Sequence, residues 1–447
     1  MNKITKKNLK TFSRKFNKKK TNKVLKNVNT KNNFRNLVLK SDYAQDKKRV
    51  FKNKINIDTK ITNQESSGRC WLFAFLNVMR LKMIKKYKLE NFEFSQNYLF
   101  FYDRLEKANY YLNYIIANKN KKLNDIKLIH TFDKLTNDGG QWNMFVNLIE
   151  KYGIVPKTNM DDHYHSKNTE ELNTFFNNFL RKAALQIRSH KPQDLSKNKQ
   201  KIINELLYDC YKILVIFLGD PPTKITWEYY KKGKKNTTTK MVNNISPLDF
   251  YKKYVPYKAK DKICLINYPC EQAPFHNLYN VELAHNIVGE KEQNYINVPI
   301  DTMVDAVKKS IDNDEAVWVG VDFDKFRSYE DGYLDREGFN YKDVFGFDNV
   351  MDKCDSMDYR QSAPDHAVVL RGYNFEKGKT NGFLVENSWG EKSGYKGNYY
   401  MAHDWFKNYV FEAVIDKKCV SKKVLDVLNK RPKLLPYWSP FGNLLEK

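Results

Sequence analysis

The feature that most constrains this chain is a cysteine that ends a short turn and opens a long apolar segment. Residues 63–75 read NQESSGRCWLFAF, and nearly every residue of 71–84 is apolar or favours helix, without Gly or Pro. A helix that is apolar on almost all sides is a buried one. The small residues 66–68 are typical of a turn and a helix N-cap. The sequence therefore predicts a buried central helix with Cys70 in its first turn.

Cys70 at such a position has the features of a nucleophile. Free N–H groups and the helix dipole favour a thiolate there. Gln64, just before the turn, would aim its side-chain amide at the same spot as an oxyanion donor. A lone cysteine beside a helix is ordinarily a small core residue. Here the glutamine, the turn and the helix occur together and favour catalysis, which also needs a base and a group that orients the base.

A hairpin near the C-terminus supplies candidates for both. Two strand-like segments, 365–373 and 382–390, flank a charged turn that contains a glycine. Pairing His366 with Asn387 puts the hairpin midpoint inside that turn, so we expect the two residues to be cross-strand neighbours. An Asn against an imidazole would set its tautomer and orientation, and Trp389 would cover the pair and exclude water. The alternative is a His and an Asn in an ordinary hairpin.

Composition indicates a folded protein. The 447 residues are 41% apolar and 14% aromatic, which is unlike a disordered chain. We expect no transmembrane helix, because no apolar run reaches about 18 residues, and no secretory signal, because the N-terminus lacks an apolar segment. The six cysteines contain no CxxC pair, which predicts reduced thiols in a cytoplasmic setting and no structural zinc.

No cofactor or metal is expected. His163 and His165 could together hold a metal ion, but no carboxylate or cysteine completes a recognisable ligand set. The net charge of +26 raises nucleic acid or acidic membranes as partners. Compositional bias toward Lys and Asn is the favoured explanation, because the excess is spread along the chain.

The N-terminal 50 residues have apolar side chains near helical spacing, at Ile4, Leu9, Phe12 and Phe16. We expect an amphipathic helix packed on the body, with a basic arm or a targeting peptide as alternatives. Further along, Ser95 is a predicted cap of a second apolar helix. Residues 138–142, DGGQW, are predicted to start a third helix that ends near residue 153.

Residues 160–300 differ from the rest. They contain helical runs at 170–190 and 199–207, a strand-like segment at 213–217 and a capped helix start at Ser246. We predict an inserted, mostly helical subdomain. A strand-like segment at 316–321 then restores an α/β pattern.

In order and context, Gln64, Cys70, His366 and Asn387 resemble the catalytic residues of the papain-like cysteine proteases. The turn at 138–140 is similar to that family's paired-glycine turn. His366 and Asn387 follow Cys70 by about 300 residues, where papain-like enzymes have about 130–150. The difference is the predicted insertion, mostly between residues 153 and 316.

The architecture resembles one branch of that family, the bleomycin hydrolase and aminopeptidase C group. The N-terminal helix is similar too, which argues against a targeting peptide. The segments that carry the resemblance lie at 63–71, 93–96, 138–142, 315–318, 386–391 and 435–444.

The resemblance implies an α+β, papain-like cysteine protease fold with a large helical insertion and a C-terminal arm. Residues 1–159 would form the N-terminal helix and the helical half of the catalytic domain, and residues 160–300 the inserted subdomain. Residues 301–430 would form the β-rich half with His366 and Asn387. Residues 431–447 would form an arm that lies in the active-site cleft.

The implied function is that of a cytoplasmic thiol aminopeptidase that acts on peptides and assembles as a homohexamer. Gly139 and Gly140 would bind substrate, and the terminal carboxylate, here on Lys447, would pair with the substrate α-ammonium. The chain departs from the group's pattern at its end, where Lys447 would be an extra residue. The enzyme itself could trim this residue.

The implied chemistry uses Cys70 as nucleophile, His366 as acid and base, and Asn387 to orient His366. Gln64 and the Cys70 backbone N–H would hold the oxyanion. One alternative is a papain-type endopeptidase, which would need an open cleft. Another is a nucleic-acid-binding hexamer with secondary peptidase activity, which would need a continuous basic surface.

Overall fold

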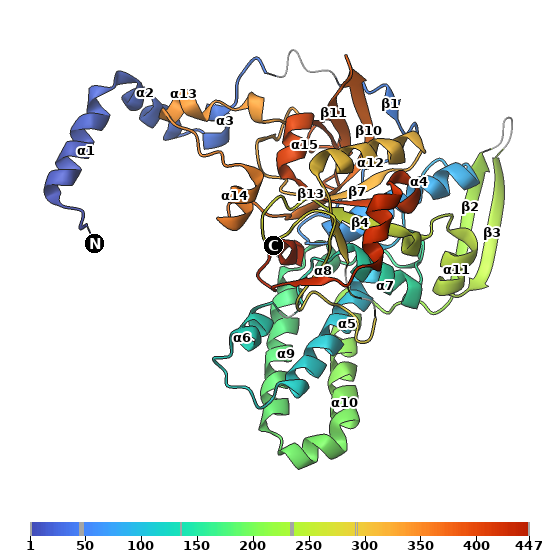
Figure 1. Ribbon diagram of the computed structural model, residues 1–447. Helices are drawn as coiled ribbons and strands as arrows, with labels where there is room; N and C mark the ends of the chain where they lie inside the picture. Colours follow the sequence, from blue (N-terminus) through green and yellow to red (C-terminus); the bar gives the residue numbers. More distant parts are fainter. Residues whose placement is uncertain are drawn as a thin grey trace.

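The chain folds around a helical half that carries Cys70 and a β-rich half that carries His366. The computed structural model describes residues 2–43, 49–134, 136–232, 237–290, 292 and 294–445 (Figure 1). The two halves contact each other where helix α4 packs on strands β7 and β10.

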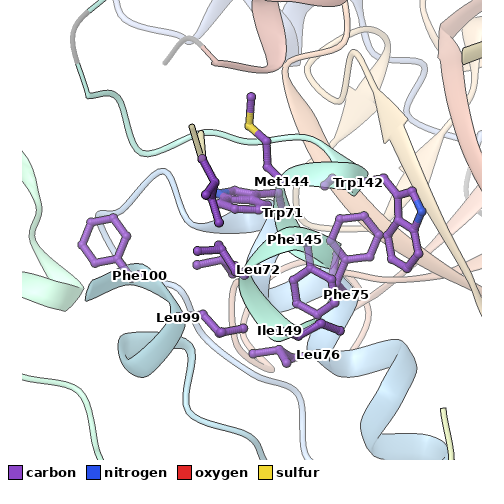
Figure 2. Packing of buried hydrophobic residues seen from close by; sticks show 14 of the residues in the cluster. Trp71, Leu72, Phe75, Leu76, Leu99, Phe100, Trp142, Met144, Phe145 and Ile149 are labelled. Atoms are coloured by element: carbon purple, nitrogen blue, oxygen red, sulfur yellow. The ribbon is translucent and has the colours of Figure 1, made fainter. Parts of the chain in front are cut away.

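Helix α4, Cys70–Tyr87, is the central buried helix that the sequence predicts. Its N-cap is Arg69, which makes no side-chain cap hydrogen bond, so the small residues before it form the turn but not the cap. Phe75 stacks on Trp318 of β7 with ring centroids 4.5 Å apart and also contacts Trp142. Figure 2 shows Phe75 beside Trp142 and Phe145 in this core. Burying one such side chain contributes about 1.5–3 kcal/mol.

Two further helices complete the Cys70 half as predicted. Helix α5, Gln96–Ala117, begins at Ser95, whose hydroxyl accepts a hydrogen bond from the Tyr98 N–H at 3.0 Å. Helix α7, Trp142–Tyr152, follows the paired-glycine turn and ends at Gly153. The shorter α6, Ile126–Asp133, lies between them in sequence.

The first part of the predicted insertion is helical. Its helices are α8, Tyr164–Lys167, α9, Glu170–Ser189, and α10, Pro192–Leu218. The prediction of a strand at 213–217 is wrong, because those residues lie in the last turns of α10. A short apolar run fits a strand or a buried helix equally well. Leu214 and Leu218, one helical turn apart, are fully buried, whereas Ile216 is 72% exposed.

The rest of the 160–300 region is mixed. Strands β2, Ile225–Lys232, and β3, Thr237–Ile245, pair with each other, and α11, Pro247–Tyr254, is capped by Ser246 as expected. Strands β4, β5 and β6, in residues 262–297, then join the large sheet. The division of the chain at residue 300 stays a prediction, because strands of one sheet lie on both sides of it.

In the described part of the chain, one large sheet of twelve strands forms the β-rich half. Its order is β14-β5-β6-β4-β13-β7-β10-β11-β12-β9-β8, with β1 beside β10. Helices α4 and α7 pack against one face through Trp318, and α12 covers the other through Val319. The strands are β1 Asn53–Lys54, β4 Lys262–Ile266, β5 Leu278–Val281, β6 Tyr295–Asn297, β7 Val317–Val321, β8 Arg327–Ser328, β9 Tyr333–Leu334, β10 His366–Glu376, β11 Lys379–Glu386, β12 Asn398–Ala402, β13 Val410–Asp416 and β14 Lys433–Leu435.

Short elements connect the strands and form the tail. The remaining helices are α12 Ile300–Asp312, α13 Tyr341–Phe345, α14 Lys353–Asp358, α15 His403–Tyr409 and α16 Lys422–Leu425. The chain then forms β14 and the 3₁₀ helix η6, Pro440–Leu445. Figure 1 shows the described end of the chain, at η6, beside the centre of the molecule.

The N-terminal helices project from the body (Figure 1). The helices of this region are α1, Lys6–Lys18, α2, Lys20–Asn29, and α3, Phe34–Val38. The sequence predicted that the region would begin with an amphipathic helix packed on the body. Helix α1 forms but contains no buried residue, and Phe12 is 56% exposed. Its apolar face therefore has no partner within the described part of this single chain. The predicted helix forms, but the predicted packing on the body does not.

Cysteine pairing also differs from expectation. Cys270 and Cys354 form a disulfide with a Cα–Cα distance of 5.3 Å, although reduced thiols were predicted throughout. The absence of a CxxC pair could not exclude this bond, because the two cysteines are 84 residues apart and meet only in the fold. Within the described residues, no helix combines the length and the apolar character needed to cross a bilayer.

Candidate active site

A cleft between the two halves brings the predicted residues together. Its volume is about 570 Å³, and Gln64, Cys70, Gly139, His366 and Trp389 all line it. These residues come from the turn before α4, the paired-glycine turn, the start of β10 and the end of β11. Only the tertiary fold joins them, since the two groups lie about 300 residues apart.

The Cys70 thiol lies against the first residues of β10. Burial raises the pKa of the Cys70 thiol to about 12, while backbone N–H groups of Ala367 and Trp71 act in the opposite direction. The helix N-terminus alone therefore does not favour a thiolate here, contrary to the sequence-based expectation, because desolvation outweighs it. A thiolate at Cys70 needs a further positive charge, which a protonated His366 would provide.

His366 and Asn387 meet through their side chains. The distance from His366 Nε2 to Asn387 Oδ1 is 2.9 Å, and the Ser388 N–H donates to the same oxygen at 2.8 Å. Asn387 is fully buried and His366 is 6% exposed. Using Nε2 for Asn387 directs the other ring nitrogen, Nδ1, away from Asn387, which is the arrangement a base needs.

The predicted register of the hairpin is off by two residues. Val369 of β10 pairs with Glu386 of β11. The residue of β10 that would lie opposite Asn387 is therefore two positions after His366, not His366 itself. His366 instead pairs with Val321 of β7 on its other side. Diagonal neighbours in a sheet are still within reach of long side chains, so the contact forms although the exact pairing was wrong.

Aromatic rings cover the pair, as predicted for Trp389. The ring centroids of Trp389 and His366 are 4.7 Å apart, and Phe323 lies 5.1 Å from His366 and 5.2 Å from Trp389. The guanidinium of Arg327 lies over Trp389. These rings shield the hydrogen bond between His366 and Asn387 from water, which strengthens it.

Gln64 is tied to the strand that carries Asn387. Its backbone N–H donates to the Ser388 carbonyl at 2.8 Å, and its side-chain Nε2 donates to the Ser67 carbonyl at 2.7 Å. Asn77 of α4 donates to Thr62 Oγ1 at 2.9 Å and to Ser388 Oγ at 3.4 Å, which joins the same two segments to α4. An amide nitrogen has two hydrogens, so Gln64 Nε2 keeps one for another acceptor.

The turn at Asp138 supports the Cys70 turn. Asp138 Oδ2 accepts the Gly68 N–H at 3.0 Å, and the Asp138 carbonyl accepts the Trp71 indole N–H at 2.7 Å. A Cβ at Gly140 would lie 2.7 Å from the Trp71 ring. Gly139 lines the cleft, whereas Gly140 faces the core. The predicted substrate-binding pair is therefore split between a cleft position and a packing position.

Buried charges hold both sides of the cleft. Arg69 forms an ion pair with Asp162 at 2.7 Å. Burial pushes the pKa of Asp162 upward, but Arg69 and Lys157 outweigh it and lower the pKa to about 2. The residue before Asn387, Glu386, is held by Arg80 at 2.7 Å and Arg371 at 2.5 Å. The sequence offers no signal for these pairs, because each joins residues that are distant along the chain.

The last predicted site residue, Lys447, lies outside the described residues. Within them, the group of side chains that could hold a metal ion is Cys270, Cys354 and Asp358. The two sulfurs of that group are bonded to each other. His163 and His165 do not belong to it.

Comparisons with known proteins agree with this geometry. The profile of the Peptidase C1-like family matches residues 3–442. The bleomycin hydrolase of Rattus norvegicus is 37% identical over 428 residues, which are 94% of each chain. The aminopeptidase C of Listeria monocytogenes is 38% identical over 395 residues, 88% of each chain. The crystal structure of PepW from Lactobacillus rhamnosis HN001 matches with a TM-score of 0.93 at 34% identity, covering 98% of this chain and 99% of that one. The predicted papain-like fold with extra regions is thereby confirmed.

Proposed function

This chain belongs to the Peptidase C1-like family, and on that premise we propose how Cys70, His366, Asn387 and Gln64 divide the work of a thiol aminopeptidase. The activity itself follows from the bleomycin hydrolase and aminopeptidase C relatives, which match most of the chain. The observation that supports the division of roles is the His366–Asn387 hydrogen bond of 2.9 Å beside Cys70 in one cleft.

In the first step, Cys70 transfers its proton to His366 and attacks the carbonyl carbon of the scissile peptide bond. Desolvation opposes a lone thiolate at Cys70, so the thiolate and the imidazolium form as a pair. The tetrahedral intermediate collapses when His366 returns the proton to the leaving amine, and an acyl-enzyme remains. His366 then removes a proton from water, and the hydroxide attacks the carbonyl carbon of the acyl-enzyme. The C–S bond breaks, the carboxylic acid leaves, and the Cys70 thiolate takes the proton back from His366.

Gln64 and the Cys70 backbone N–H stabilise the oxyanion of the tetrahedral intermediate. Gln64 Nε2 uses one hydrogen for the Ser67 carbonyl at 2.7 Å, and its second hydrogen serves the oxyanion. Donors that are held in place before the reaction pay no reorganisation cost. Gly139, which lines the cleft, binds the peptide backbone, and Gly140 allows the turn to approach Trp71.

The C-terminal arm restricts the enzyme to the ends of peptides. It enters the cleft, and the carboxylate of Lys447 pairs with the α-ammonium of a bound peptide. A chain that continued past that point would collide with the arm. Without this restriction the same residues would serve a papain-type endopeptidase, which is the alternative.

Assembly as a homohexamer in the cytoplasm is part of the proposal. The exposed apolar face of α1, at Leu9, Phe12 and Phe16, would pack on another copy of the chain, which a single chain cannot provide. The basic residues of α1 and α2, which carry part of the net charge of +26, would be the surface that binds nucleic acid.

The test compares free-amine and N-blocked fluorogenic peptides with the full chain and with a chain lacking residues 443–447. The full chain should prefer free amines, and the shortened chain should lose that preference while it keeps its oligomeric state. Cys70→Ala gives the background for both. Equal preference in the two chains would contradict the proposed role of the arm.

A further inference from the structure

The C-terminal segment is fastened to the body at Phe441. Its ring is fully buried and contacts Tyr268 and Tyr295, with centroid distances of 5.4 and 5.8 Å. Its backbone carbonyl accepts a hydrogen bond from Gln141 Nε2 at 3.2 Å. Upstream, β14 pairs with β5, so the segment is held on both sides of the bend at residues 436–440.

Gln141 connects this attachment to the cleft. It directly follows the paired-glycine turn, in which Gly139 lines the cleft, and its carbonyl accepts the first hydrogen bond of α7 from the Phe145 N–H at 3.1 Å. Its side chain is fully buried. We therefore expect displacement of this side chain to change the position of the tail at Phe441.

A buried carboxyl group lies behind Gln141. Glu412 of β13 is fully buried, the Cys264 thiol donates weakly to its Oε2 at 4.0 Å, and the Gln141 amide is close enough to lower its pKa. Among the described residues, polar atoms left without a hydrogen-bond partner include Gln141 Oε1, Glu412 Oε1 and Tyr295 Oη. Such atoms are costly in a core, and their gathering around the arm attachment marks the cluster as more than packing.

We infer that Gln141 and Glu412 are positioning residues that aim the C-terminal arm into the cleft. Gln141 Nε2 has two hydrogens, one for the Phe441 carbonyl and one for Glu412. Glu412 thus sets the orientation of the amide, and the amide sets the position of residue 441. This inference rests on the proposed role of the arm in selecting free peptide ends.

The protonation state of Glu412 controls this attachment. Burial raises the pKa of Glu412 to about 8, and the hydrogen bond from Gln141 opposes the rise. The titratable groups that face it are Cys264 of β4 and Tyr295 of β6, and burial raises the pKa of both well above their ordinary values. Neither becomes charged near pH 8. Above that pH an ionised Glu412 would be an uncompensated charge in the core, which would favour entry of water and loosening of the packing around Phe441.

The first test is Gln141→Leu, with Gln141→Asn as a shorter amide that keeps the polarity. The matched control is Gln200→Leu, which replaces an exposed glutamine of α10 whose amide donates within the same helix to Asn204 Oδ1. We expect both Gln141 variants to raise the ratio of N-blocked to free-amine cleavage about fivefold, the size expected from one lost neutral hydrogen bond. The control should leave the ratio unchanged.

Hydrogen exchange provides a readout that does not depend on activity. The amides of Ser439 and Gly442 donate within the tail to the Pro436 and Ser439 carbonyls, each at 2.8 Å. Their protection factors should fall about fivefold in both Gln141 variants. Unchanged protection and an unchanged ratio in folded variants would overturn the inference.

The second test follows protection of the same amides from pH 6.5 to 9. In the wild-type chain protection should fall as the pH passes through about 8, and in Glu412→Gln, which cannot ionise, it should not. An identical fall in both proteins would overturn the role of Glu412. If the arm deletion also left the cleavage ratio unchanged, the proposed function of the arm would fail. If only the Gln141 and Glu412 variants had no effect, this inference alone would fail.

Discussion

His366 Nε2 lies 2.9 Å from Asn387 Oδ1, although the β10–β11 ladder does not place the two residues opposite each other. Asn387 lies just beyond the last paired residue of β11, Glu386, and its side chain meets His366 diagonally, because His366 is two positions from the residue that would lie opposite Asn387. Glu386 is itself held by Arg80 and Arg371. The position of Asn387 therefore depends on a buried ion cluster as well as on strand pairing.

Replacement of the nucleophile should abolish activity. Cys70→Ala removes one sulfur atom from the start of α4 and should lower kcat/KM by at least about a thousandfold, with the thermal unfolding temperature nearly unchanged. Labelling by a thiol alkylator should disappear as well. Cys210→Ala is the control, since Cys210 is buried and free but lies outside the cleft. Substantial hydrolysis by Cys70→Ala would contradict the assignment.

The base and the group that orients it should differ in their effects. His366→Ala should lose nearly all activity, because His366 is the proposed acid and base that exchanges a proton with Cys70. Asn387→Ala should lose less, by about ten- to a hundredfold, since it only orients the ring. Measurement of kcat/KM for both variants checks the order. A larger loss in Asn387→Ala than in His366→Ala would show that the two roles are misassigned.

Glu386→Gln should destabilise the fold. Removing one partner of a buried ion cluster leaves uncompensated charge and costs about 3–5 kcal/mol. The control Lys85→Ala removes an exposed ion pair with Asp314 and should cost less than about 1 kcal/mol. Urea unfolding of both variants gives the comparison, and similar losses would refute the role of the cluster.

The same cluster predicts a pH dependence of stability. Burial pushes the pKa of Glu386 upward, but Arg80 and Arg371 outweigh it, so the pKa in the folded protein lies below the ordinary 4.5. An acid with a lowered folded pKa stabilises the fold above its unfolded pKa and loses this contribution as the pH falls. Stability should therefore decline on acidification below about pH 4.5, and the part of the decline due to Glu386 should be missing in Glu386→Gln.

The oligomeric state can be measured directly. Light scattering coupled to size exclusion should give a mass near six times the 53.0-kDa chain. Phe12→Ser should lower that mass, because Phe12 is 56% exposed on α1 in the single chain and would be covered in the assembly. Ser13→Ala, on the same helix, is the control. A monomer for the unmodified chain would rule out the proposed assembly.

Local patterns were reliable where one short segment contained the whole signal. The caps at Ser95 and Ser246, the end of α7 at Gly153 and the buried helix after Cys70 all occur as predicted. The segment 213–217 was misread as a strand because its apolar residues fit two periodicities. The α1 helix was predicted correctly but its packing was not, since no sequence pattern states which chain covers an apolar face.

The sequence by itself identified the family, which the comparisons confirm, and it selected Cys70, His366 and Asn387 as the proposed nucleophile, base and orienting residue, because residue type, order and neighbouring motifs suffice for these. The tertiary structure alone decided the contacts between distant residues. These include the diagonal His366–Asn387 contact, the Cys270–Cys354 bond, the Glu386 ion cluster and the attachment of Phe441 to Gln141. The physical reason is that the energy of each of these contacts depends on the burial of its groups and on the distance between them. Both are set by how whole elements pack, and neither is encoded in any one segment.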